Sequence, residues 1–228
     1  MINSNITGYC QSVKEDNIII LKRNSTMHVE DDNSPLVPLT GTNEPFMFEA
    51  SSFEGDRHMI RADVAEKLIR INEILKEKKL ALYIRSLWRS PLHQAEMSIH
   101  KFELLKKLHP SKTISQINAI VSYFVPSEYQ SMHRTGGAVE ALIIDLETGQ
   151  ILDFGSNCGD QIELSVKCYP YYPDLSDIAR KNRKLLIGIF EQEGFVVSPI
   201  EFYHFNYGNV AWATGKDLDY AIYGPIFY

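Results

Sequence analysis

The segment Ser131-Met-His-Arg-Thr-Gly-Gly-Ala-Val-Glu140, together with Glu201-Phe-Tyr-His204, carries the most information about the fold and the chemistry of this chain. The two segments hold two histidines and two carboxylates among aromatic and small residues. A catalytic zinc needs three protein ligands drawn from His and Asp/Glu, with a fourth position left for water. His133, Glu140 and His204 can supply these ligands. Glu201 then remains as a carboxylate that could take a proton from the water.

The residues before and after Glu140 predict a sharp turn followed by a strand. Gly136-Gly137 is a pair that breaks regular structure. Ala138-Val-Glu-Ala-Leu-Ile-Ile-Asp-Leu146 then has the apolar content of a strand that is buried on at least one face. A free carboxylate at Glu140 is costly to bury unless a cation compensates it. A metal ion would supply that compensation.

The second segment is also expected to lie in a strand, over residues 196–205. Side chains alternate between the two faces of a regular strand, so Glu201 and His204, three positions apart, would point to opposite sides. A site that uses both residues therefore requires a bend or bulge between them. Pro199 and Gly208 bracket the segment and favour such an irregularity.

These segments resemble those of a known family. His133-x-x-Gly-Gly-Ala-x-Glu140, with Ser131 two residues before the histidine, resembles the Ser-x-His-x-x-Gly-x-Ala-x-Asp signature of the D-alanyl-D-alanine dipeptidases. These are zinc enzymes of the group that also holds D,D-carboxypeptidases and the hedgehog fold. Glu201-Phe-Tyr-His-Phe205 is similar to the family's Glu-Trp-Trp-His-Phe segment. Ser86-Leu-Trp-Arg-Ser-Pro91 is similar to its Asp-Gly-Tyr-Arg-Pro element, which supplies an arginine to the active site.

Shorter matches extend the resemblance, in the family's order, over roughly residues 55 to 213. Together with the expected elements, it implies an α+β fold in a single domain, with an antiparallel sheet that carries the metal site and about three flanking helices. We expect residues 1–50 to form an N-terminal arm packed on a catalytic domain of residues 51–228. The matching short segments are Thr148-Gly149, Gly155-Ser156 through Asp160, Asn182-Arg183, Gly194-Phe195 and Trp212-Ala213.

The resemblance also implies a role for each site residue. One Zn²⁺ per chain would be bound by His133, Glu140 and His204. Glu201 would act as the general base, and Arg89 would pair with the developing oxyanion. The free amino end of a small dipeptide, D-alanyl-D-alanine or a close analogue, would be bound by Ser131 and Asp160.

Two departures from the family pattern lie at the site. The family has Asp where this chain has Glu140, and the extra methylene moves the carboxylate outward by about one bond length, although Glu is itself a zinc ligand. The chain also has Ser86-Leu87-Trp88 where the family has Asp-Gly-Tyr. These changes leave three alternatives open. They are hydrolysis of another small amide or a peptidoglycan stem, a non-haem iron enzyme with the same ligand types, and a metal-stabilised binding module without catalysis.

Composition restricts the class of protein further. The 228 residues suffice for one domain with a substantial core. A net charge of −6 argues against a broad nucleic-acid surface, and no stretch is apolar enough for a membrane helix. The start of the chain does not resemble a signal peptide. Cys10, Cys158 and Cys168 match no disulfide framework or zinc motif, which favours free thiols and a cytoplasmic location.

Periodicity and turn residues predict the remaining elements. The C-terminal tail, residues 218–228, is aromatic and is expected to pack over the core or against a partner subunit in a homo-oligomer. The histidines of the second expected helix, at 93, 100 and 109, are expected to be surface or packing residues rather than ligands. We expect strands at residues 17–22, 80–84 and 151–154, helices at 62–79, 90–108, 114–124 and 176–194, and a hairpin turn at 147–150.

Overall fold

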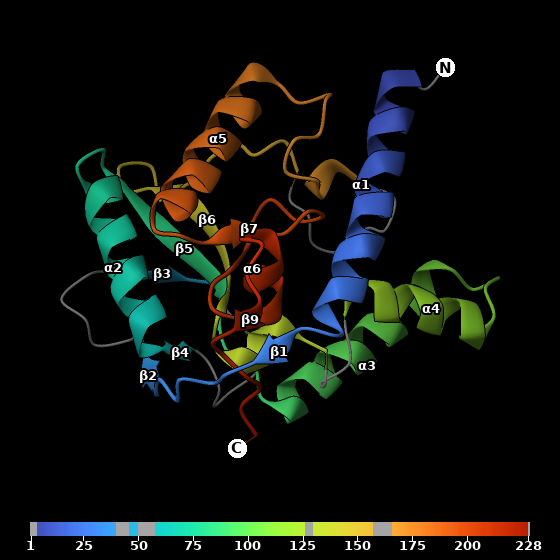
Figure 1. Cartoon of the computed structure of the whole chain (residues 1–228). Helices are drawn as coiled ribbons and strands as arrows, with labels where there is room; N and C mark the ends of the chain where they lie inside the picture. Colours follow the sequence, from blue (N-terminus) through green and yellow to red (C-terminus); the bar gives the residue numbers. More distant parts are fainter. Residues whose placement is uncertain (1–3, 40–45, 50–57, 126–129, 157–165, 228) are drawn as a thin grey trace.

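A five-stranded sheet lies at the centre of the protein (Figure 1). The computed structural model describes residues 4–39, 46–49, 58–125, 130–156 and 166–227. Within these residues the strand order is β3-β5-β6-β8-β7, in which β3 and β5 are parallel and the other pairs are antiparallel. The predicted α+β class, with a mainly antiparallel sheet, is confirmed. The strands are Met47–Phe48 (β3), Leu80–Ser86 (β5), Ala138–Asp145 (β6), Val196–Val197 (β7) and His204–Asn206 (β8).

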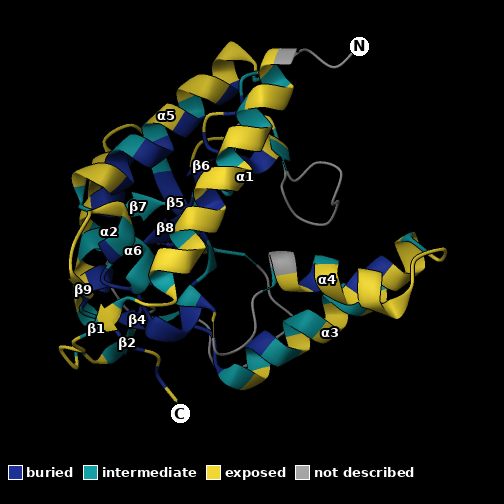
Figure 2. Cartoon of the chain, turned by 45° about the vertical axis from the view of Figure 1, so that its right-hand side comes forward, coloured by how far each residue is buried: buried dark blue, intermediate teal, exposed yellow. Residues whose placement is uncertain are grey.

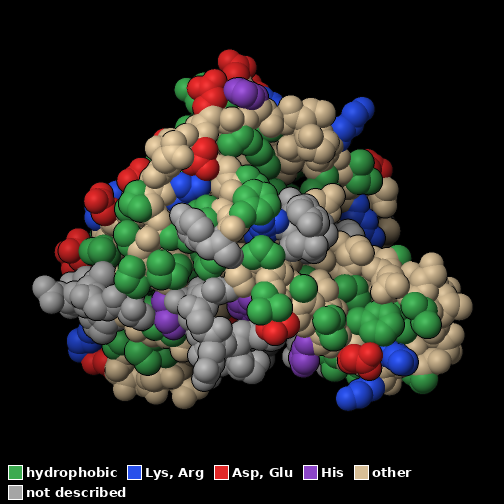
Figure 3. Space-filling model, turned by 90° about the horizontal axis from the view of Figure 1, so that it is seen from below, with side chains coloured by type: hydrophobic (Ala, Val, Ile, Leu, Met, Phe, Trp, Pro, Cys, Tyr) green, Lys and Arg blue, Asp and Glu red, His purple; other side chains and the backbone are tan. Residues whose placement is uncertain are grey.

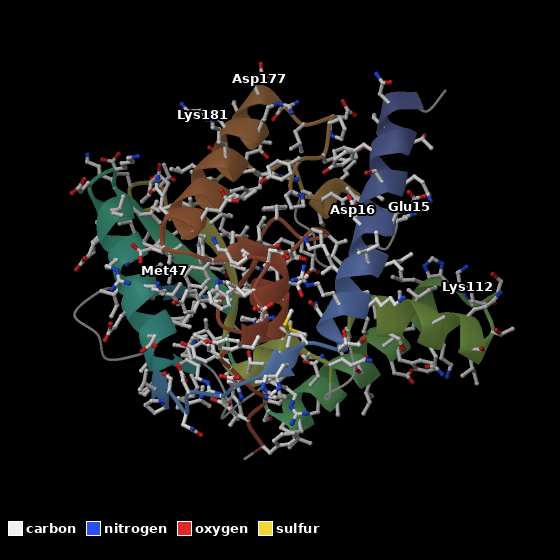
Figure 4. The ribbon with its side chains drawn as sticks, in the orientation of Figure 1. Glu15, Asp16, Met47, Lys112, Asp177 and Lys181 are labelled. Atoms are coloured by element: carbon white, nitrogen blue, oxygen red, sulfur yellow. The ribbon has the colours of Figure 1, made fainter. Side chains whose placement is uncertain are left out.

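Helices α2 (Ala62–Lys76) and α5 (Asp177–Gln192) form one hydrophobic core with the sheet. Apolar residues three and four positions apart give each helix a buried stripe, and Ser176 caps α5 by accepting a hydrogen bond from the Ala179 amide at 3.1 Å. Charged side chains such as Asp177 and Lys181 point away from the sheet (Figure 4). The core includes Val64, Leu68, Ile71 and Leu75 from α2, Leu186, Ile187 and Phe190 from α5, and Leu82, Ile84, Val139, Ala141 and Ile143 from the sheet.

The opposite face of the sheet carries the polar residues of interest. Glu140 lies between Val139 and Ala141, which both point into the core, so its side chain points to the other face, called here the site face. The pairing of β5 with β6 shifts register between Ile84 and Ser86, which marks a β-bulge. Ser86 lies directly opposite Glu140 as a result.

The predicted strand at residues 17–22 is wrong, because these residues lie within helix α1 (Ser4–Asn24). Ile18 and Ile19 are exposed, whereas Asn17 is buried, so the helix turns only a narrow stripe inward. A short apolar run cannot be assigned to helix or strand by its periodicity alone. The end of α1 lies beside α6 (Val210–Gly215), where Arg23 forms an ion pair with Asp217 at 2.7 Å.

Helices α3 (Pro91–Leu108) and α4 (Ile114–Phe124) form a hairpin to one side of the sheet (Figure 2). Leu105, Ile117 and Val121 make a small core of their own between the two helices. Both helices were predicted. Ser90, which was not predicted as a cap, accepts a hydrogen bond from the His93 amide. Seen from below, the surface in the region of this hairpin mixes hydrophobic with charged side chains (Figure 3).

Two short additional pairs of strands lie outside the central sheet. β1 (His28–Val29) pairs in parallel with β9 (Tyr220–Ala221), and β2 (Leu36–Pro38) pairs antiparallel with β4 (Met59–Arg61). In the C-terminal tail, Tyr223 is completely buried. The tail therefore packs on the core of its own chain, one of the two outcomes expected for it.

Two further predicted strands differ in the structure. The segment 196–205 is not one strand but two, since the chain reverses after β7 and returns antiparallel as β8. This reversal is the irregularity that a site using both Glu201 and His204 requires. The predicted strand at residues 151–154 is reduced to a single bridge between Ile144 and Ile151. Helices α2, α3, α4 and α5 and strands β5 and β6 lie where the sequence predicts them, within a few residues at their ends, whereas β3 and α6 were not predicted.

The expectation of three free thiols is wrong for Cys168, which is disulfide-bonded. Cys10 is a free thiol, and Cys158 lies outside the described residues. Sequence spacing could not reveal this bond, because the spacing matches no common disulfide pattern. Among the residues that the structure describes, none of the helices combines the length and apolar content that crossing a membrane requires.

Gly137 tests how tightly the turn before β6 is packed. An added Cβ would lie 2.2 Å from the backbone oxygen of Tyr207, so Gly137→Ala must displace backbone and should lower the free energy of unfolding by about 1–3 kcal/mol. Gly188 in α5 is the matched control, because an added Cβ there meets no atom within 4 Å. Gly188→Ala should raise stability by up to about 1 kcal/mol. Urea unfolding measures both changes, and equal shifts in the two variants would contradict this account.

Candidate metal centre

His133 is positioned by a short 3-10 helix, η1 (Met132–Thr135). The helix ends at Gly136, whose φ of 69° lies in the left-handed region that glycine adopts without strain. The side chain of His133 is buried, and its Nδ1 lies 2.6 Å from the backbone oxygen of Leu87. Trp88 also donates a hydrogen bond to the backbone oxygen of Arg134 at 3.2 Å. The Ser86-Leu-Trp-Arg element and η1 are thereby held together.

Glu140 and His204 are direct neighbours across the sheet, where β6 pairs with β8. One ligand atom from each of His133, Glu140 and His204 lies within 4.8 Å of the other two. The two imidazole rings are nearly perpendicular, with centroids 4.9 Å apart. The structure therefore brings together the three residues that the sequence proposes as metal ligands.

The protonation of His133 suits it to bind a cation. A carbonyl oxygen only accepts hydrogen bonds, so Nδ1 must carry the proton and Nε2 must carry the lone pair. Nε2 is buried and makes no aligned hydrogen bond with any described residue, although Oε1 of Glu140 lies 3.1 Å away. Burial and the charge of Arg89 lower the pKa of His133 to about 3. A neutral ring with an unpaired, inward-facing nitrogen is the state that a metal ligand requires, so these residues fit a divalent cation.

Arg89 lies beside Glu140 and controls its charge. Its Nη2 lies 2.5 Å from Oε1 of Glu140, and its Nε donates to the Ser86 hydroxyl at 2.8 Å. Burial alone would raise the pKa of Glu140, but Arg89 and His133, with a further contribution from Arg85, hold this pKa well below its ordinary value. Glu140 is therefore ionised, as a ligand carboxylate must be.

Glu201 lies in the turn between β7 and β8, next to the proposed ligands. Its Oε2 is 3.6 Å from Nδ1 of His204, and its Oε1 accepts a hydrogen bond from the Tyr203 hydroxyl at 3.1 Å. Burial raises the pKa of Glu201, an effect that His204 offsets only in part and that the charge of Glu140 reinforces. A carboxylate with a raised pKa is suited to accept and return a proton near neutral pH.

The two residues expected to bind substrate have different outcomes. Ser131 is buried at the start of η1, two residues from His133. Asp160 lies outside the described residues. The structure therefore brings Ser131 near the candidate metal centre and does not place Asp160.

Sequence reasoning missed Tyr203, Arg85 and the backbone oxygen of Leu87. Tyr203 is buried and donates to Glu201, while the guanidinium of Arg85 lies 4.9 Å from the centre of its ring. Tyr203 could have been noticed, because it stands where the resembling family has a tryptophan, which lacks a hydroxyl. Arg85 was not singled out, although strand alternation with the buried Ile84 places it on the face that carries Glu140.

An α+β domain whose sheet and adjoining 3-10 helix bring together two histidines and a carboxylate, with a further carboxylate alongside, has the site of a metallopeptidase. Residues 42–221 match the model of the peptidase M15 family, described as D-Ala-D-Ala dipeptidase. This match covers well over half of the chain, which therefore belongs to the peptidase M15 family.

Individual relatives match shorter parts of the chain. The D-alanyl-D-alanine dipeptidase of Synechocystis sp. is 37% identical over 92 residues, which cover 36% of this chain and 36% of that protein. The D-alanyl-D-alanine dipeptidase of Escherichia coli is 35% identical over 83 residues, 36% of this chain and 41% of that protein. The matches thus span less than half the length of either relative. A solved structure of VanYB in complex with D-alanine-D-alanine has a TM-score of 0.47 at 14% identity, over 83% of this chain and 92% of that one.

Removal of a proposed ligand tests the metal centre directly. Zn²⁺ should raise the unfolding temperature of the wild-type protein, because a ligand at 100 times its Kd stabilises the folded state by about 2.7 kcal/mol. His204→Ala should abolish this shift and lower the zinc content of the purified protein well below that of the wild type. His100→Ala, at an exposed position of α3, is the control and should behave as wild type. Full zinc occupancy in His204→Ala, measured by elemental analysis, would exclude His204 as a ligand.

Proposed function

We propose that the protein hydrolyses a small dipeptide, D-alanyl-D-alanine or a close analogue, with one zinc ion bound by His133, Glu140 and His204. The observation that carries the proposal is the buried, unpaired Nε2 of His133, which lies next to Glu140 and His204 in a site that also contains Glu201. Membership of the peptidase M15 family supports the reaction class. The named relatives are both D-alanyl-D-alanine dipeptidases, and they support the substrate.

The metal site and Glu201 have complementary roles in this proposal. Zinc, when bound, supplies a Lewis acid that polarises a carbonyl oxygen and makes a water molecule more acidic. Glu201 accepts the proton of the attacking water and passes it to the departing amine. The hydrogen bond from Tyr203 fixes Oε1 of Glu201 and so orients the carboxylate for this transfer.

Arg89 supplies positive charge for the developing oxyanion. Its planar guanidinium keeps a fixed charge, and its contact with Ser86 holds Nε in place. Nη2 of Arg89 contacts Glu140, so the positive charge lies directly beside the residues that would hold the cation. Ser131 and Asp160 would bind the free amino end of the dipeptide, which restricts the substrate to short molecules.

Hydrolysis of a different small amide is the second candidate. Two departures from the family pattern favour it: Glu140 in place of Asp, and Ser86-Leu87-Trp88 in place of Asp-Gly-Tyr. Glu140 and Ser86 both contact Arg89, and they lie opposite each other in the sheet. A zinc-loaded assay against D,D-, L,D- and L,L-dipeptides separates the two candidates. We expect release of free amino acid from the D,D-dipeptides; turnover of another class alone would favour the second candidate.

Glu201→Gln tests the proposed general base. The amide keeps the shape of the side chain but cannot accept the proton, so kcat should fall by about 10²–10⁴-fold while zinc content stays at the wild-type level. Glu191→Gln, an exposed position on α5, is the control and should leave kcat unchanged. A zinc-loaded Glu201→Gln protein with wild-type kcat would remove Glu201 from the mechanism.

A further inference from the structure

Arg85 lies at the bulge in β5, on the same face of the sheet as Glu140. The register of β5 against β6 shifts between Ile84 and Ser86, so Arg85 is the residue at the irregularity. Because Ile84 packs in the core, the side chain of Arg85 points to the opposite face. The guanidinium of Arg85 lies over the ring of Tyr203, with its central carbon 4.9 Å from the ring centroid. Tyr203 in turn hydrogen-bonds Glu201, so Arg85 lies one residue away from the proposed base.

The charge of Arg85 is only partly used by its neighbours. Its Nε contacts both carboxylate oxygens of Glu49, at 3.3 and 3.4 Å, and Glu49 is 40% exposed. Neither terminal Nη group has a hydrogen-bond acceptor among the described residues. The side chain keeps 16% of its surface exposed. Among the described residues, the planar pair of Nη groups therefore has no acceptor, while the guanidinium lies between Glu49 and the Tyr203 ring.

The surroundings keep Arg85 charged. Although burial alone would lower the pKa of Arg85, the carboxylates of Glu140 and Glu49 raise it above its ordinary value. The side chain is too weakly solvated to be an ordinary surface arginine and lacks the bidentate partner that a structural arginine usually has. Both properties are typical of an anion-binding residue.

We infer that Arg85 forms an anion subsite that binds a carboxylate of the substrate beside the candidate metal centre. This inference rests on the proposed function and adds to it that the substrate is recognised through a carboxylate near the scissile bond. The paired Nη groups match a carboxylate geometrically. The carboxylate is either the C-terminal one or one on a side chain, and the experiment distinguishes these sources.

The test compares wild type with Arg85→Gln on three substrates. D-alanyl-D-alanine carries only a terminal carboxylate, the α-amide of D-alanyl-D-glutamate carries only a side-chain carboxylate, and D-alanyl-D-alanine amide carries neither. For the substrate whose carboxylate binds Arg85, kcat/KM should fall roughly ten- to hundredfold, chiefly through KM. The neutral amide should be unaffected. Equal losses on all three substrates, or no loss on any, would overturn the subsite.

Two further variants and a binding measurement make the test specific. Arg85→Lys retains the charge without the paired donors and should recover part of the loss. Arg70→Gln is the matched control, since Arg70 is an exposed arginine of α2 that pairs with Glu193 at 2.9 Å. Calorimetric titration of the metal-free wild type and Arg85→Gln with the same three substrates measures their binding affinities in the absence of hydrolysis. Charge-dependent binding that Arg85→Gln loses supports the subsite even if no dipeptide is hydrolysed, and its absence overturns it.

Discussion

Burial of the Glu140 carboxylate is the constraint on which the rest of the site depends. An isolated ionised carboxylate loses far more hydration free energy on burial than one residue can recover by packing. Here the nearby Glu201 carboxylate adds repulsion, so the site must supply positive charge. Arg89 supplies part of it by direct contact, and the unpaired ring nitrogen of His133 marks where a cation would supply more. The same surroundings lower the pKa of Glu140 and raise the pKa of Glu201. Glu140 is therefore suited to be a metal ligand, and Glu201 is suited to be a base.

Two buried arginines that bind backbone oxygens hold the segments around this site. Arg61 donates to the backbone oxygen of Thr135 at 2.8 Å, which fixes η1, and also pairs with Asp31 at 2.9 Å. Arg183 donates from all three nitrogens to backbone oxygens, those of Phe154, Lys167 and Tyr169. Because an arginine without its acceptors would be left charged and desolvated, each network either forms completely or destabilises the fold. The hydrogen bonds of these two arginines therefore hold segments that are distant in the sequence against the region of the candidate site.

The sequence predicted those features that depend on local pattern. Helices α2 and α5 followed from apolar spacing and the Ser176 cap, and the grouping of His133, Glu140 and His204 followed from ligand chemistry and family resemblance. Features that depend on tertiary contacts could not be predicted from the sequence. The residues of α1 were assigned in part to a strand because one face of that helix is apolar yet exposed. The contact of Tyr203 with Glu201 requires the reversal between β7 and β8, which periodicity does not encode.

The two departures from the family pattern are connected in space. Ser86 and Glu140 face each other in the β5–β6 register, and both contact Arg89. At the first position the resembling family has Asp, where this chain has the neutral hydroxyl of Ser86. At the second position both have a carboxylate, and in this chain the longer Glu140 contacts Arg89 at 2.5 Å. The two positions together therefore hold one carboxylate in this chain and two in the family. With fewer negative groups competing for Arg89, its charge acts more strongly on the space beside His133 and His204, where the reaction centre is proposed.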